Sequence, residues 1–189
     1  MSLFRFGKIV STLLLTAALG LPQQAKSPAA PGMTLTTAAF ADGSEIPGKY
    51  TQSVPSPVSP SLEWSNVPAN VASFVLLMHD PDVAVQKKTD DVLHWLMVNI
   101  PGSMRSLPEG VPVGAQGPEG SVQLKNAGGV NGYRGPGAPA AGPYHHYTLE
   151  LFALDSRLDL GPEATRADVL RSIDGHILAK AVLVGRFHR

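Results

Sequence analysis

Residues 73–82 read SFVLLMHDPD, an apolar run that ends in two carboxylates on either side of a proline. The run is apolar on both alternating faces, which predicts a strand that is covered on both sides in the middle of the domain. Pro81 disfavours helical geometry at Asp80, so Asp80 and Asp82 are expected to be extended and to project to the same side. The plainer alternative is an ordinary turn in which one carboxylate caps backbone amides.

Other short runs also predict strands. Residues 94–100 and 146–154 are apolar and bounded by proline, glycine or aspartate, as strands usually are. Weaker strand signals lie at residues 33–37 and 182–187. Residues 53–61 carry three prolines, which cannot donate to a strand ladder, so this segment is expected at an edge or in an extended surface segment.

Helical patterns are confined to the C-terminal part of the chain. Thr165 and Asp168 have the spacing of a capping box, with aspartate in place of the usual glutamate, and a second short helix is expected to begin at His176. The chain has no internal repeat and no regular alternation of helices and strands. The sequence therefore predicts a mainly β fold with peripheral C-terminal helices.

Histidines stand at the start of two predicted strands. A period of two places His94 on one face with Leu96, although a histidine in this position is more often a core residue bonded to a backbone carbonyl. By the same period His145 and Tyr147 share a face, whereas His146 points the opposite way. We therefore expect His145 in any shared pocket and His146 at the surface.

Residues 125–139 are too rich in glycine for a helix and too broken for a strand, so they predict a loop. Glycine lets backbone amides approach a ligand and hold an anion, although many loops of this composition bind nothing. The spacing matches neither a P-loop nor a dinucleotide-binding fingerprint.

Composition excludes several classes of protein. The 189 residues contain no cysteine, which excludes disulfides, thiolate metal sites and cysteine nucleophiles. The formal net charge is zero and the 15 basic residues are scattered, so no nucleic-acid partner is expected. Beyond its N-terminus the chain fits one domain and has no run of about 18 apolar residues, the length that a membrane-spanning helix needs.

The N-terminus has the features of an export signal. Two basic residues precede a nearly all-apolar stretch at residues 9–21, and residues 18–20 are a possible cleavage site. The expected organisation is a signal peptide at 1–21, a proline- and alanine-rich linker at 22–32 and one domain at 33–189. An uncleaved anchor is the alternative, and without cysteine a lipoprotein anchor is not expected. The expected location is the periplasm or the exterior of the cell.

Six motifs follow one another in an order and spacing known from one family. They are SPSLEW at 59–64, DPD at 80–82, HWLMVNIP at 94–101, KN at 125–126 with GYRGP at 132–136, HHY at 145–147, and GHILA at 175–179 with LVGRF at 183–187. From about Met33 to Arg189 the chain resembles the phosphatidylethanolamine-binding protein family, in its bacterial Raf kinase inhibitor-like branch. The resemblance implies antiparallel β-sheets in a sandwich-like arrangement with peripheral helices.

The resemblance also implies a small anion pocket for phosphate or a phosphoethanolamine headgroup. By position its residues are Asp80, Asp82, His94, Gly135, Pro136, His145 and Tyr147. Imidazoles, a hydroxyl and backbone amides can donate to phosphate oxygens, and carboxylates can receive an ammonium. The expected protein is a non-enzymatic binding protein without cofactor or metal, and its affinity for phosphate should improve as the histidines become protonated.

Two alternatives remain open. One is a protein-interaction role, such as inhibition of a protease or kinase through residues 53–61 or 105–121. The other is a hydrolase or metal-dependent enzyme that uses the Asp and His cluster, although the usual zinc-site and nucleophile-elbow spacings are missing. The chain departs from the family pattern at Val83-Ala84 and Gly137-Ala138, so the rim of the pocket is expected to differ.

Overall fold

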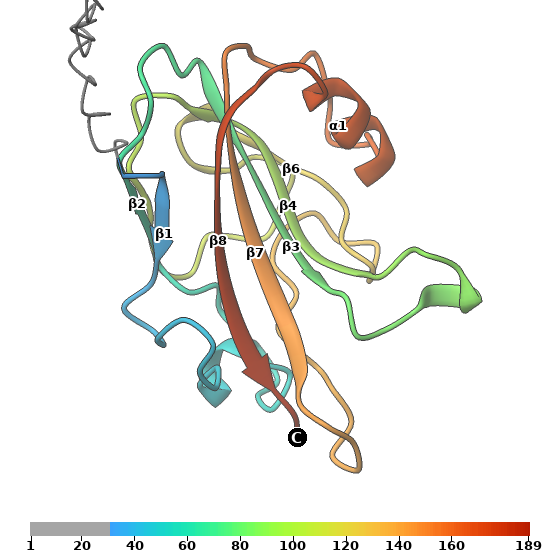
Figure 1. Cartoon of the computed structure of the whole chain (residues 1–189). Coiled ribbons are helices and arrows are strands. Elements are labelled where there is room, and N and C mark those ends of the chain that lie inside the picture. Colours follow the sequence, from blue (N-terminus) through green and yellow to red (C-terminus); the bar gives the residue numbers. More distant parts are fainter. Residues whose placement is uncertain (1–30) are drawn as a thin grey trace, which may run out of the picture. The chain divides into compact units, whose positions relative to one another are not determined.

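The computed structural model describes residues 31–189, so the predicted signal peptide and most of the predicted linker lie outside the described residues. In this part of the chain eight strands form two antiparallel sheets, accompanied by one α-helix, α1 (Arg166–Ile173) (Figure 1). This is the mainly β, antiparallel fold that the sequence predicted.

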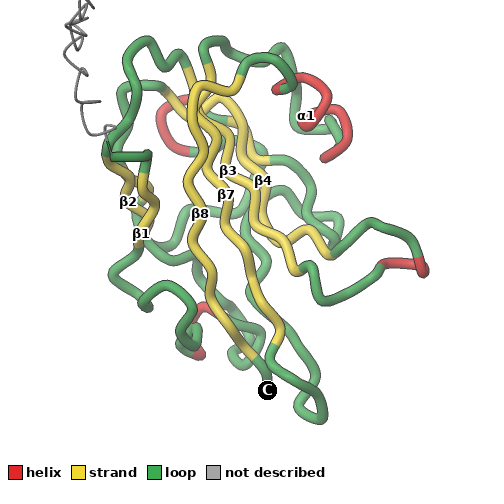
Figure 2. Tube along the Cα trace, viewed as in Figure 1, coloured by secondary structure: helices red, strands yellow, loops and turns green. Residues whose placement is uncertain are grey.

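The larger sheet has five strands in the order β6-β4-β3-β7-β8. Their bounds are β3 (Ser73–Asp80), β4 (Val92–Pro101), β6 (Val122–Gln123), β7 (His145–Leu154) and β8 (Ile177–Phe187). Figure 2 shows the four long strands side by side. The three strongest strand predictions are confirmed as β3, β4 and β7, which occupy the middle of this sheet.

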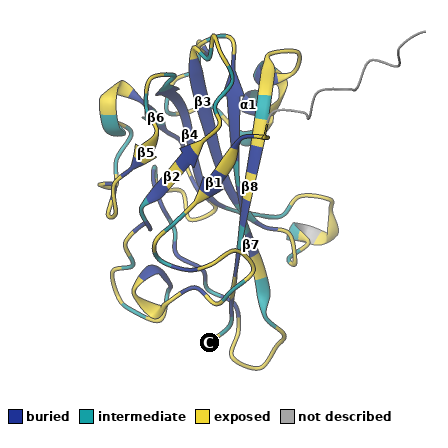
Figure 3. Cartoon of the chain, turned by 60° about the vertical axis from the view of Figure 1, so that its left-hand side comes forward, coloured by how far each residue is buried: buried dark blue, intermediate teal, exposed yellow. Residues whose placement is uncertain are grey.

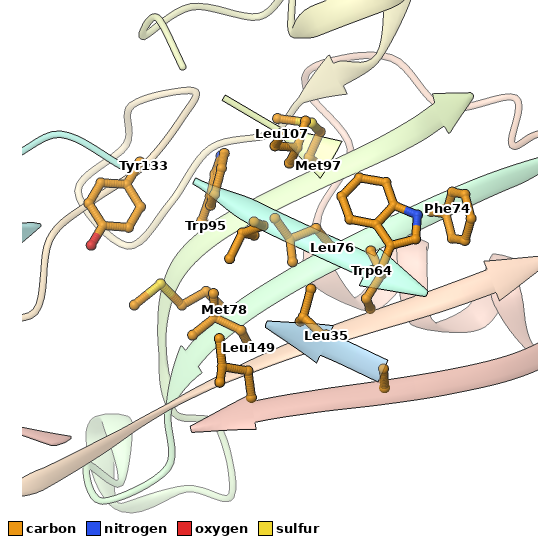
Figure 4. Close-up of a cluster of buried hydrophobic side chains, with 14 of the residues drawn as sticks. Leu35, Trp64, Phe74, Leu76, Met78, Trp95, Met97, Leu107, Tyr133 and Leu149 are labelled. Atoms are coloured by element: carbon orange, nitrogen blue, oxygen red, sulfur yellow. The ribbon is translucent and has the colours of Figure 1, made fainter. Parts of the chain in front are cut away.

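The smaller sheet has three strands in the order β1-β2-β5 and packs against one face of the larger sheet. Its strands are β1 (Thr34–Thr36), β2 (Leu62–Ser65) and β5 (Ser106–Leu107). Figure 4 shows the apolar side chains that fill the space between the sheets. Among them, Trp64 of β2 meets Phe74 of β3 edge to face, with ring centroids 5.4 Å apart, an arrangement that aromatic rings favour.

Strand β3 is buried on both faces (Figure 3). Leu76 and Met78 face the smaller sheet, whereas Val75 and Leu77 belong to a second cluster on the opposite face. Helix α1 covers that second cluster with Val169 and Ile173. The prediction of a strand covered on both sides is confirmed.

Helix α1 begins at the predicted capping box. The Thr165 hydroxyl accepts from the Asp168 backbone amide, and the Asp168 carboxylate accepts from the Thr165 amide. The predicted second helix at His176 is wrong. Gly175 has a φ of 81°, which ends the helical segment, and the chain then pairs with β7 along the whole of β8.

Three short 3₁₀ segments interrupt the loops, namely η1 (Gly48–Tyr50), η2 (Val85–Lys87) and η3 (Pro118–Gly120). Residues 53–61 form neither helix nor strand, in accord with their prolines. Within residues 31–189, no helix has both the length and the apolar character that would let it cross a membrane.

Candidate functional site

The sheet topology gathers three sequence motifs at one edge. Strands β4 and β7 both run antiparallel to β3, so each of them begins where β3 ends. The end of β3 carries Asp80, whereas His94 and His145 lie at the beginnings of β4 and β7. Residues that are far apart along the chain therefore become neighbours here.

Asp80 is the buried carboxylate of this edge, with 3% of its surface exposed. One oxygen, Oδ1, accepts a hydrogen bond from the Asp82 backbone amide at 3.0 Å, which closes the turn around Pro81. The other oxygen, Oδ2, lies 2.8 Å from Nδ1 of His145. Asp80 thus fulfils the turn-capping alternative and also orients an imidazole.

His94 reaches the site through a β-bulge. Met78 pairs with Trp95, but His79 pairs with Leu93, so one residue of β4 has no counterpart on β3. At such a bulge two successive side chains can lie on one side of the sheet. His94 therefore contacts the Tyr147 ring, with centroids 5.0 Å apart, and the expectation that it shares a face with Leu96 is wrong.

The surroundings of His94 fix its tautomer. Its Nδ1 lies 2.8 Å from the carbonyl oxygen of Arg134, which can only accept, so Nδ1 carries the proton and Nε2 is left for a ligand. Burial lowers the pKa of His94, outweighing the hydrogen bond to Arg134 and the charge of Asp80, both of which favour the protonated form.

Tyr147 forms the floor between the two histidines and is fully buried. Its hydroxyl oxygen accepts hydrogen bonds from the backbone amides of Gly137 and Ala138, each at 3.2 Å. Burial, together with the nearby charge of Asp80, raises the pKa of Tyr147 to about 12. The phenol is therefore neutral at physiological pH.

Asp82 and His146 form a second, outward-facing pair. The Asp82 Oδ2 atom accepts from the His146 backbone amide at 2.5 Å and lies 3.1 Å from its Nδ1. Partial burial raises the pKa of Asp82, but the hydrogen bonds from His146 outweigh this and hold it below its usual range. His146 is exposed, as predicted, and the two carboxylates bind different histidines instead of sharing one site.

A cavity of about 210 Å³ opens at this edge. Four of the seven predicted site residues line it, namely Asp80, His94, His145 and Tyr147. The remaining wall consists of Gln52, Val83, Val92, Arg134, Gly137, Ala138 and Pro139. Asp82, Gly135 and Pro136 are not among the lining residues. The family departures at Val83, Gly137 and Ala138 do belong to the wall.

Gly135 and Pro136 lie behind the wall and hold Gln52 in place. The Gln52 side-chain amide donates to the Gly135 carbonyl, and the Gln52 backbone amide donates to the Pro136 carbonyl, both at 2.8 Å. Gly135 is tightly packed, since a Cβ atom there would lie 2.7 Å from the Tyr50 carbonyl oxygen. These two residues therefore shape the pocket indirectly.

Sequence reasoning missed Gln52 and Arg134. Gln52 belongs to none of the six motifs and directly precedes the proline-rich segment 53–61, and no residue pattern around it signals a ligand site. Arg134 stands inside the GYRGP motif and within the glycine-rich loop at residues 125–139, and this position is the signal that could have identified it. The two residues together add a neutral donor group and a fixed positive charge to the wall.

Two larger hollows, each of about 380 Å³, lie beside β1. Neither contains a histidine. One is lined mainly by threonine and apolar residues of β1, β8 and the segment after β1, and the other lies across the three strands of the smaller sheet. The 210 Å³ cavity is the better candidate, because it combines convergent polar groups with two residues whose pKa values are shifted, and both features mark functional sites. Within the described residues, no group of three or more His, Asp or Glu side chains is placed to hold a metal ion.

Comparison with known proteins gives consistent matches. A family model described as phosphatidylethanolamine-binding protein matches residues 36–188. A UPF0098 protein of Methanothermobacter thermautotrophicus is 41% identical over 157 residues, covering 83% of this chain and 99% of its own. LppC of Mycobacterium tuberculosis, named as a candidate lipoprotein, is 35% identical over 162 residues, covering 85% and 75% respectively. The crystal structure of CT736 from Chlamydia trachomatis, a candidate phosphatidylethanolamine-binding protein homologue, superposes with a TM-score of 0.72 at 33% identity, covering 84% of this chain and 98% of that one.

Proposed function

The chain belongs to the phosphatidylethanolamine-binding protein family, and from this premise we propose that it is an exported binding protein whose cavity at the end of β3 holds a phosphate group. Family membership supports a binding role in general. The finer assignment, a phosphate-bearing small molecule such as a phosphoethanolamine headgroup, rests on the chemistry of the cavity wall. No catalytic role is assigned to any residue.

The observation that carries the proposal is the matched arrangement of the two histidines. His94 and His145 each use Nδ1 for a protein acceptor, a carbonyl in one case and a carboxylate in the other. Each therefore keeps Nε2 for a ligand. Two imidazoles oriented in this way can donate to two oxygens of one phosphate once they are protonated.

The size of the cavity favours a headgroup over a whole lipid. Sites for drug-sized ligands usually occupy about 300–1,000 Å³, whereas this cavity measures about 210 Å³. A phosphate with a short polar substituent suits this volume, but acyl chains would have to remain outside. The ammonium of phosphoethanolamine can be received by the Asp80 carboxylate, which lies in the same wall.

Phosphate binding is expected to strengthen as the pH falls below neutrality. Burial lowers the pKa of His94, so this imidazole is neutral at pH 7 and its Nε2 is then an acceptor. Protonation converts Nε2 into a donor and adds a positive charge. Affinity for a phosphate anion should therefore increase until the phosphate itself becomes less charged.

Titration calorimetry with phosphoethanolamine tests the proposal. The wild type is compared with His145→Ala and with His146→Ala, which removes an adjacent but exposed imidazole. We expect His145→Ala to abolish measurable binding and His146→Ala to retain it. No binding to the wild type at pH 6, or equal binding by all three proteins, would exclude the assignment.

These proteins, together with a variant that carries both His94→Ala and His145→Ala, discriminate the alternatives. Release of phosphate from phosphoethanolamine or p-nitrophenyl phosphate that depends on His145 would contradict the non-enzymatic role and favour a hydrolase. Binding to a protease or kinase that survives substitution of both His94 and His145 would favour a surface-mediated interaction instead.

Export is the remaining part of the proposal. It is supported by the signal-like pattern of residues 1–21 and by the similarity to LppC, since a lipoprotein is an exported protein. Expression of the full chain in a bacterial host, followed by fractionation, tests it. Recovery of the full-length protein in the cytosol alone would contradict export.

A further inference from the structure

Arg134 is tied to the pocket by its backbone. Its amide donates to the carbonyl of His94 at 2.8 Å, and its own carbonyl accepts from Nδ1 of the same histidine, also at 2.8 Å. These two bonds fix the position of Arg134 relative to His94. The backbone of Arg134, from which the side chain extends, therefore lies at the wall of the phosphate cavity.

Among the described residues the guanidinium of Arg134 has no acidic partner. It takes part in none of the ion pairs found among residues 31–189. Its Nε atom is buried and makes no hydrogen bond within this part of the chain. Burying a donor without a partner is destabilising, and such a group in a native protein calls for an explanation, for example a ligand.

Arg134 also lines a second hollow. Its volume is about 290 Å³, and it shares the Gln52 and Arg134 side chains with the phosphate cavity. Gly128 lines this hollow, and a Cβ atom at that position would lie only 2.6 Å from Nη1 of Arg134. The tip of the guanidinium is thus accommodated over a glycine, in the second hollow.

We infer that Arg134 binds a second anionic group of the ligand in this neighbouring hollow while the first phosphate occupies the cavity. The ligand class is then a phosphorylated compound that carries a carboxylate or a further phosphate a few bonds away. This inference rests on the proposed function. It narrows the choice of ligand, because phosphoethanolamine alone leaves the guanidinium without an anion.

The chemistry of arginine suits this role. A guanidinium presents a planar fork of donors that matches a carboxylate or phosphate with two parallel hydrogen bonds. Gln52 also lines both hollows, but one N–H of its side-chain amide is taken by the Gly135 carbonyl and the group carries no charge. Of the two residues that the hollows share, Arg134 is therefore the one that can pair with an anion through its charge.

O-Phosphoserine and phosphoethanolamine form a matched pair of probes, because they differ only in the carboxylate of phosphoserine. We expect the wild type to bind phosphoserine at least about tenfold more tightly, as is typical of one additional charge-assisted interaction. In Arg134→Gln this preference should fall to about threefold or less, while binding of phosphoethanolamine persists.

Two further variants test whether the preference for phosphoserine depends on the position of the Arg134 guanidinium or only on the positive charge of the protein. Gly128→Ala keeps the arginine but displaces its guanidinium, and it too should reduce the preference for phosphoserine. Arg171→Gln removes an exposed positive charge on α1 and should leave the preference unchanged. Circular dichroism and thermal unfolding check that each variant is folded.

The possible outcomes distinguish the two proposals. If the wild type binds neither probe, the proposed phosphate site itself fails. If it binds both probes equally, or if Arg134→Gln weakens both by the same factor, the phosphate site stands and the inference about Arg134 is wrong. The inference is also wrong if Arg171→Gln lowers the preference for phosphoserine as much as Arg134→Gln does. The same measurement with vesicles that contain phosphatidylserine identifies the source of the ligand. Arg134-dependent binding to the vesicles indicates a lipid headgroup, whereas Arg134-dependent binding to soluble phosphoserine alone indicates a free metabolite.

Discussion

The Asp80 carboxylate and the His145 imidazole lie 2.8 Å apart, although 65 positions separate them in the sequence. Both side chains are largely shielded from solvent, with 4% and 13% of their side-chain surface exposed. In the adjacent pair, Asp82 and His146, the corresponding values are 38% and 51%. Two similar Asp and His pairs therefore differ mainly in burial, which allows a direct comparison.

We expect Asp80→Ala to destabilise the protein by about 2–4 kcal/mol, because it leaves the Asp82 amide and the His145 Nδ1 without their acceptor in a buried site. Asp82→Ala should cost less than about 1 kcal/mol, because exposed pairs contribute little. Urea unfolding at pH 7 measures both values. Similar losses in the two variants would show that burial does not decide the strength of these pairs.

Much of the candidate site could be predicted from the sequence, because its motifs lie at the ends or the beginnings of predicted strands. The apolar runs identified β3, β4 and β7, and antiparallel pairing then brings Asp80 and His145 together. The period-two alternation also separated His145 and Tyr147 from His146 correctly.

The remaining features depend on tertiary structure. The bulge that turns His94 toward Tyr147 is a property of the pairing between β3 and β4, and a strict period of two cannot reveal it. Gln52 joins the wall through hydrogen bonds to a segment 83 positions away, so no local pattern marks it. The sequence predicts only the last part of β8, at residues 182–187. The first residues of this strand, Ile177 and Leu178, are both apolar and both exposed, so they do not show the alternation of a strand.

Asn99 is expected to be important for the geometry of β4. It is buried with a φ of 58°, and its side chain donates to the Leu158 carbonyl and accepts from the Leu158 amide, both at 2.8 Å. Asn99→Ala loses both bonds and keeps the unfavourable φ, so we expect a loss of about 2–4 kcal/mol in the free energy of unfolding. Asn99→Gly should be less destabilising than Asn99→Ala, because glycine adopts positive φ without strain. The reverse order would contradict a backbone contribution.

Tyr147→Phe tests the link between the pocket floor and the loop before β7. The substitution removes the oxygen that accepts from Gly137 and Ala138. We expect faster hydrogen exchange at these two amides and a loss of about 1–2 kcal/mol in stability. Tyr144→Phe is the control, because it removes an exposed hydroxyl that contacts Glu45. Unchanged exchange at Gly137 and Ala138 would mean that other contacts hold the loop.

His94 should make the unliganded protein less stable in mild acid. Burial lowers the pKa of His94 in the folded state, whereas in the unfolded chain it titrates near its usual value of about 6.5. The unfolded state therefore binds more protons in the interval between these two values. As the pH falls from about 7 through this interval, stability should decrease by at most about 1.4 kcal/mol per pH unit and then level off below the pKa of the folded state.

His94→Gln isolates this contribution, because glutamine keeps a donor for the Arg134 carbonyl but does not titrate. We expect a smaller loss of stability between pH 7 and pH 5 in this variant than in the wild type, measured by urea unfolding in buffers without phosphate. His176→Gln, which replaces an exposed imidazole paired with Asp155, is the control and should follow the wild type. Parallel pH profiles for the wild type and His94→Gln would mean that the burial of His94 does not disfavour its protonation. At acid pH, added phosphate should increase the stability of the wild type more than that of His94→Gln. The reason is that a protonated imidazole at position 94 can bind the anion, whereas a neutral glutamine adds no charge.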